Sequence, residues 1–120
     1  MREHLFRGRN GLGNWFYGGY IYCKYSETHN IVNENTARSF DWFDVIPETI
    51  GQFTGLTDKN GANIFEHDKI YIDGMYLGYI LLTDGAFNLI EENNQSGSNI
   101  INQARMNRME IIGNIHEGDK

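Results

Sequence analysis

The side chains best suited to binding chemistry gather around one glycine of the chain. Asp58 and Asn60 come just before Gly61, and Glu66 and Asp68 follow it closely. Carboxylate and amide oxygens are the ligands that Ca²⁺ prefers, and an EF-hand loop ends on a bidentate Glu six residues after its glycine. His67 occupies that position here. The spacing therefore excludes an EF-hand.

A hairpin turn explains the same residues more simply. The run Asp58-Lys59-Asn60-Gly61 lies between apolar segments, and Asn-Gly is a strong hairpin signal because both residues tolerate positive φ. The polar side chains would then hydrogen-bond the backbone of their own turn, and Asp68 would accept from nearby amides. We therefore interpret the following residues as structural residues of turns: Gly55, Asp58, Asn60, Gly61 and Asp68.

A second cluster, Glu66-His67-Asp68, places an imidazole between two carboxylates. Neighbouring residues of a strand point to opposite faces, so these three side chains are not expected to converge on a substrate. Cys23 has no neighbouring base in the sequence, and the glycines at 8, 11 and 13 are not followed by a helical pattern, as a phosphate loop requires. No histidine pair has metal-ligand spacing among His4, His29, His67 and His116. We therefore assign no catalytic, metal or cofactor-binding residue and expect a protein that is not an enzyme.

Composition indicates the elements that must position these residues. The chain has 120 residues, 14 glycines and one proline, and its apolar residues are mostly Ile, Tyr and Phe rather than Ala. This balance favours short strands joined by glycine turns in a single, mainly β domain.

The local patterns predict the order of those elements. We expect strands at 3–6, 15–25, 40–45, 64–65, 69–72, 76–82, 86–90 and 109–115, with Asp-Gly turns at 73–74 and 84–85. Gly18 and Gly19 inside the second strand indicate a bulge or a close approach of another backbone. Residues 26–35 are polar and predict a loop or a weak strand, and 99–108 predict a short helix capped by Ser98 or Asn99. The regular turn spacing favours an N-terminal β region (1–53) followed by a small SH3-like barrel (54–117) within one domain.

Charge and cysteine content narrow the partners. A formal net charge of −6 does not favour duplex DNA, although Arg2, Arg7, Arg9 and Lys24 could form a local basic patch or simply a solvated edge. Cys23 is the single cysteine, which suits a reducing cytosol, and no segment has the length or apolarity of a membrane span or a signal peptide.

Four separated blocks resemble the YopX family of bacteriophage and prophage proteins. The strongest block spans 46–70, where Thr54-Gly55-Leu56 leads through Asp58-Lys59-Asn60-Gly61 to Ile64-Phe65-Glu66 and Asp68. Weaker blocks are the N-terminal residues Met1, Arg2, Glu3, Phe6 and Arg7, the motif Trp15, Tyr17 and Gly18, and the segment 110–117. The family usually has glycine where this chain has His67. The resemblance implies a phage-type protein in the cytoplasm of the host bacterium and carries over no biochemical activity.

Aromatic residues provide the remaining functional signal. Most of them should pack in the core or across strands, but Trp15, Tyr17, Tyr20 and Trp42 could form an interaction surface. We expect such a surface to serve protein–protein contact or self-assembly into a homo-oligomer. The alternative is a platform for single-stranded nucleic acid in phage replication or regulation.

Overall fold

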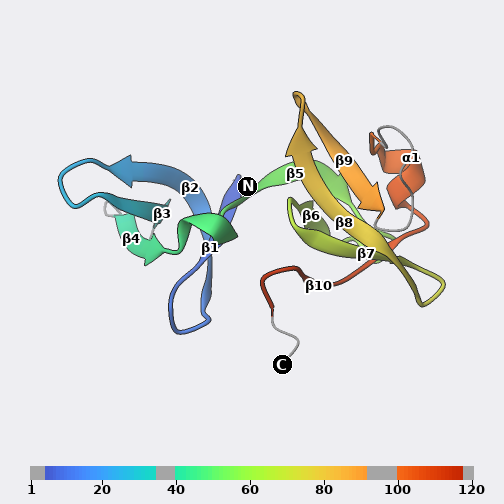
Figure 1. Ribbon diagram of the computed structural model, residues 1–120, viewed down its shortest axis with the longest axis horizontal. Helices are drawn as coiled ribbons and strands as arrows, with labels where there is room; N and C mark the ends of the chain where they lie inside the picture. The colour runs from blue at the N-terminus through green and yellow to red at the C-terminus, as the bar shows by residue number, and fades with distance from the viewer. Residues whose placement is uncertain (1–4, 35–39, 92–99, 118–120) are drawn as a thin grey trace. The chain divides into compact units, whose positions relative to one another are not determined.

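The computed structural model describes residues 5–34, 40–91 and 100–117. It is mainly β, with antiparallel sheets, and contains a single α-helical turn among these residues (Figure 1). Contacts between residues divide the chain into two compact units, residues 1–53 and 54–120. Each unit is described by itself below.

The first unit is a sheet in the order β4-β3-β2-β1-β5. Its elements are β1 (Phe6–Arg9), β2 (Trp15–Cys23), β3 (Thr28–Glu34), β4 (Phe40–Val45), the 3-10 turn η1 (Pro47–Thr49) and the start of β5 (Gly51–Thr57). Ile31 and Val45 are buried at its centre, and the Phe16 and Phe43 rings stack with their centroids 4.0 Å apart.

Two local predictions for this unit need comment. Of the strand predicted at 3–6, residues 3 and 4 lie outside the described residues, and β1 extends beyond its predicted end from Phe6 to Arg9, so that it includes Gly8. A Cβ at Gly8 would lie 2.8 Å from Cγ2 of Val45, so glycine serves tight strand packing there. The polar segment after Tyr25, predicted as a loop or a weak strand, contains the strand β3, which pairs with a strand on either side and buries Ile31.

The close backbone approach predicted at the glycine pair of β2 is confirmed at Gly18. A Cβ there would lie 2.3 Å from the carbonyl oxygen of Val32 on the neighbouring strand. The same construction at Gly19 meets nothing closer than 3.9 Å. One glycine of the pair is thus required by packing and the other is not.

The second unit contains the end of β5, with β6 beside it, and a four-stranded antiparallel sheet in the order β10-β7-β8-β9. Its elements are β6 (Asn63–Phe65), β7 (Asp68–Ile72), β8 (Met75–Thr83), β9 (Ala86–Glu91), α1 (Gln103–Met106) and β10 (Glu110–Asn114). The core of the unit consists of Ile64, Ile70, Ile80, Leu89, Ile101, Met106 and Met109. Within the described part of the chain no closed barrel is found: β9 and β10 remain the edges of the sheet, so the predicted SH3-like closure is not confirmed.

The two predicted Asp-Gly turns are present in the second unit, whereas its helix differs from the prediction. Both Asp-Gly turns have positive φ at each residue, 50° and 79° at 73–74 and 54° and 80° at 84–85, as the hairpin chemistry requires. The helix is much shorter than predicted, and the side chain of Asn102 caps it by accepting from the N–H of Arg105 at 2.8 Å. The predicted caps at 98 and 99 lie outside the described residues.

Candidate functional site

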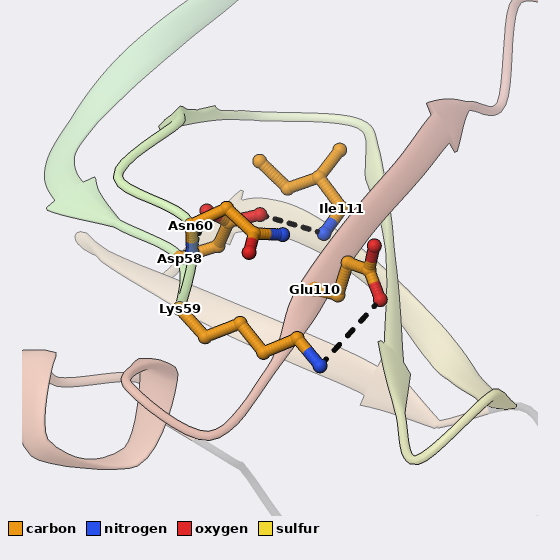
Figure 2. Close-up of polar contacts among 5 residues, drawn as sticks. All are labelled: Asp58, Lys59, Asn60, Glu110 and Ile111. Carbon is orange, nitrogen blue, oxygen red and sulfur yellow. Dashed lines mark hydrogen bonds and ion pairs between the residues drawn. The ribbon is translucent and has the colours of Figure 1, made fainter.

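The signature turn is built around the buried carboxylate of Asp58, whose residue is 4% exposed. Its Oδ1 atom accepts hydrogen bonds from the backbone N–H groups of Asn60 and Ala62, both at 2.9 Å. Its Oδ2 atom accepts from the N–H of Ile111 on β10 at 3.0 Å (Figure 2). The carboxylate therefore holds both its own turn and a strand far away in the sequence.

The turn itself differs from the Asn-Gly hairpin that the sequence predicts. Gly61 has φ +83°, whereas Asn60 does not adopt positive φ. The N–H of Gly61 donates to the carbonyl of Asp58, and the N–H of Asp58 donates to the carbonyl of Ala62. These bonds make a turn followed by a left-handed glycine, the bulged hairpin form rather than the two-residue form. Gly55, with φ +86°, takes the same left-handed conformation within β5.

Two further contacts join the turn to the segment around β10. The N–H of Lys59 donates to the carbonyl of Met109 at 2.9 Å, and the Lys59 ammonium lies 3.8 Å from Oε1 of Glu110 (Figure 2). Both side chains of this ion pair are well exposed, so the pair contributes little by itself. The buried Asp58 carries most of the connection.

The polar segment between β6 and β7 forms a second tight turn. Oδ2 of Asp68, a residue 2% exposed, accepts from the N–H of Phe65 at 2.7 Å. His67 has φ +82°, the conformation in which glycine costs nothing and histidine is strained. A glycine at this position would therefore relieve the strain.

The structure brings together two histidines that the sequence separates. Nδ1 of His67 lies 3.0 Å from Nε2 of His116, and the rings meet edge to face. The carbonyl of His67 also accepts from the N–H of Ile115 at 3.0 Å, and Nε2 of His67 lies 3.9 Å from the Glu66 carboxylate. Sequence spacing could not show this pairing because it depends on the register of β10 against β7.

Carboxylates of the polar cluster accept hydrogen bonds from backbone amides. Oε2 of Glu66 accepts from the N–H of Leu82, and the Asp58 and Asp68 oxygens accept from backbone amides. Among residues 5–34, 40–91 and 100–117, no three His, Cys, Asp or Glu side chains lie close enough to hold a metal ion. The Asp58 and Asp68 carboxylates therefore stabilise the turns in which they lie.

The predicted aromatic surface is only partly assembled. The register pairs Val32 of β3 with Gly19 on one side and Trp42 on the other. Because alternate residues of a strand share a face, Tyr17 and Ile21 lie on the same face as Trp42. We call the set Tyr17, Ile21, Val32 and Trp42 the aromatic face. The exposed fractions of Tyr17, Ile21 and Trp42 are 38%, 42% and 53%.

Trp15 and Tyr20 do not contribute equally to this face. Trp15 lies on the same side but is half-buried, with the Arg7 guanidinium 5.0 Å from its ring centroid. Tyr20 projects from the opposite side, where it contacts Phe6 and stacks on His29. Its hydroxyl lies 2.6 Å from Nδ1 of His29. The two-residue period of β2 already implies that Tyr20 and Tyr17 lie on opposite sides, whereas Ile21 and Val32 are the members of the aromatic face that sequence reasoning missed.

The local basic patch does not form as a unit. Arg7 is buried at 6% exposure and Arg9 is half-buried, while Lys24 is exposed in the turn after β2. Arg2 lies outside the described residues. Cys23 is half-buried, and a hydrogen bond with the Ser26 side chain lowers the pKa of its thiol below the ordinary value.

A separate open pocket lies in the second unit, with a volume of about 410 Å³. Its lining is Lys69, Tyr71, Tyr76 and Ile115. None of these residues belongs to the candidates chosen from sequence, because their shared position follows from the pairing of β7 with β8.

Comparison with protein-family models gives a match to this chain. The model of the family described as YopX protein matches residues 6–120, essentially the whole chain. No curated protein matches the chain. Over the described ranges, no helix has the length and apolarity needed to cross a membrane.

Proposed function

The chain belongs to the YopX family, and we propose that it is a non-enzymatic phage or prophage accessory protein that works through protein–protein contact. The observation that supports this proposal is the aromatic face of the first unit. Large aromatic side chains exposed together on a sheet are enriched in protein interfaces and uncommon on surfaces with no partner. The lone cysteine agrees with action in the host cytoplasm, where thiols stay reduced.

A non-enzymatic role is supported by how the polar residues are used. The carboxylates of Asp58 and Asp68 accept backbone hydrogen bonds while buried, which commits them to the fold. General acids and bases instead need a proton-transfer path to a substrate.

Self-association is a form of protein–protein contact that needs only a second copy of this chain. A two-fold interface places the same patch of each subunit face to face, so Trp42 of each copy would meet the Tyr17 and Ile21 side of the other. Edge-to-edge pairing through β4 is less favoured, because exposed Asp41 and Asp44 place charges on that edge strand. We therefore propose face-to-face association.

Sedimentation velocity from micromolar to millimolar protein tests this proposal. Wild type should show concentration-dependent association, and Trp42→Ser or Tyr17→Ser should shift the protein toward monomer. Tyr25→Ser is the matched control, because Tyr25 is fully exposed in the turn after β2 and does not belong to the aromatic face. A wild type that stays monomeric at the highest concentration would refute self-association.

A second candidate, a nucleic-acid-associated module, is favoured by the pocket of the second unit. A lysine side chain can bind a phosphate group, and a tyrosine ring can stack on a base. This candidate uses different residues from the aromatic face.

A further inference from the structure

The outer face of the second sheet collects tyrosines around one lysine. In β7 the buried core residue Ile70 alternates with Lys69 and Tyr71, which therefore point away from the core. Across the ladder, Lys69 pairs with Tyr79 and Tyr71 pairs with Tyr76. The pairing of the two strands thus places Lys69 and three tyrosines on one face of the sheet, and Lys69, Tyr71 and Tyr76 line the same pocket.

Part of this face is hollowed into the open pocket described above. The rings of Tyr71 and Tyr76 form one side, with centroids 5.3 Å apart and planes at 54°. Ile115, 41% exposed, adds an apolar contact, and Lys69 supplies the charge. The volume of about 410 Å³ falls within the range of small-ligand sites.

The net charge of −6 does not describe the surroundings of this pocket. Glu110, which pairs with Tyr71, carries an ion pair to Lys59 at 3.8 Å. Glu91, opposite Gly78 on β8, carries one to Arg105 at 3.5 Å. On the strands that flank β7 and β8, Glu110 and Glu91 are therefore each paired with a cation, whereas Asp73, in the turn after β7, is an exposed acid.

We propose that this pocket binds one nucleotide of a single-stranded nucleic acid. The base would lie against the Tyr71 and Tyr76 rings, the sugar against Ile115, and the neighbouring phosphate on the Lys69 ammonium. Aromatic rings accept any base by stacking, and a single lysine matches a single phosphate. The inference rests on the second candidate function and is independent of the aromatic face of the first unit.

Fluorescence anisotropy of a labelled oligothymidylate at low salt tests the site directly. Tyr76→Ser should weaken binding about 5-fold to 100-fold, the usual effect of losing one stacked base, while Tyr76→Phe should keep the affinity because it keeps the ring. Lys69→Gln should weaken binding and reduce the slope of log affinity against log salt by about one phosphate contact. Tyr25→Ser and Lys24→Gln are matched controls, exposed in the first unit, and should change nothing.

Further binding measurements distinguish a nucleic-acid strand from a mononucleotide and from free phosphate as the ligand. Affinity should rise from thymidine monophosphate to the oligonucleotide and should be absent for inorganic phosphate alone. No binding of the oligonucleotide at low salt would overturn the proposal, as would equal affinity for wild type, Tyr76→Ser and Lys69→Gln. The proposal would also be overturned if the oligonucleotide bound no more tightly than thymidine monophosphate. It would likewise be overturned if a proline-rich peptide displaced the labelled oligonucleotide and nucleotides did not. Trp42→Ser should leave this binding intact, so failure here and failure of self-association are distinguishable.

Discussion

The Oδ2 atom of Asp58 accepts a hydrogen bond from the backbone N–H of Ile111 at 3.0 Å, across 53 positions of the sequence. The turn thus holds β10, the last described strand of its unit. A buried carboxylate with three backbone donors cannot be removed without leaving those donors unsatisfied.

Replacing Asp58 should therefore destabilise the second unit. We expect Asp58→Ala to lower the free energy of unfolding by about 3 kcal/mol, because charge-assisted hydrogen bonds are lost and buried amides are stranded. Asp58→Asn should cost less, since one oxygen can still accept from the turn. Both tryptophans lie in the first unit, so circular dichroism in urea and hydrogen exchange at the Ile111 amide are the appropriate measurements.

Asp84→Asn is the control for this change, since Asp84 is exposed in another turn. Its effect should stay within about 0.5 kcal/mol. An unchanged hydrogen-exchange rate at the Ile111 amide in Asp58→Ala would contradict the conclusion that Asp58 holds β10 in place.

The glycine pair of β2 gives a matched test of backbone approach. Gly18→Ala should destabilise the first unit by about 2 kcal/mol, because the new methyl group would collide with the Val32 carbonyl. Gly19→Ala should be nearly neutral, as a Cβ there would meet the Val32 carbonyl oxygen only at 3.9 Å, an ordinary van der Waals contact. Urea unfolding followed by tryptophan fluorescence measures both, and equal losses for the two variants would refute the close approach.

Strain at His67 can be separated from its contact with His116. In a His116→Ala background, His67→Gly should raise the free energy of unfolding by about 1 kcal/mol, because glycine adopts φ +82° freely. In the wild-type background the gain should be smaller, since the imidazole contact is lost at the same time. Thermal and urea unfolding of the four proteins complete the cycle. Destabilisation by His67→Gly in both backgrounds would show that the strain is not significant.

The thiol of Cys23 should react at lower pH than an ordinary cysteine. A hydrogen bond with the Ser26 side chain favours the thiolate and lowers the pKa of Cys23, so the thiolate fraction at neutral pH is raised. Alkylation rates against pH should give a midpoint below that of the urea-unfolded protein, and Ser26→Ala should move it upward. Identical midpoints for folded and unfolded protein would contradict this contact.

Local sequence determined much of the secondary structure. The strands β2, β4, β8 and β9 follow aromatic and β-branched runs, and the Asp-Gly turns follow from residues that tolerate positive φ. The sequence left residues 26–35 open between a loop and a weak strand, and pairing on both sides together with the buried Ile31 makes this segment the strand β3 despite its weak local propensity. The helix was overestimated because asparagine-rich sequence gives little local signal for its ends.

Kinship, fold class and turn chemistry could be inferred from sequence, since these depend on residues that are neighbours in the chain. The contacts between distant groups became known from the folded structure alone: Asp58 with Ile111, His67 with His116, and Lys69 with the tyrosines of two strands. It also separated Tyr20 from Tyr17 and Trp42, and left the second sheet open where a barrel was expected. The physical reason is register, because the pairing of strands fixes which side chains share a face and no short stretch of sequence encodes that alone.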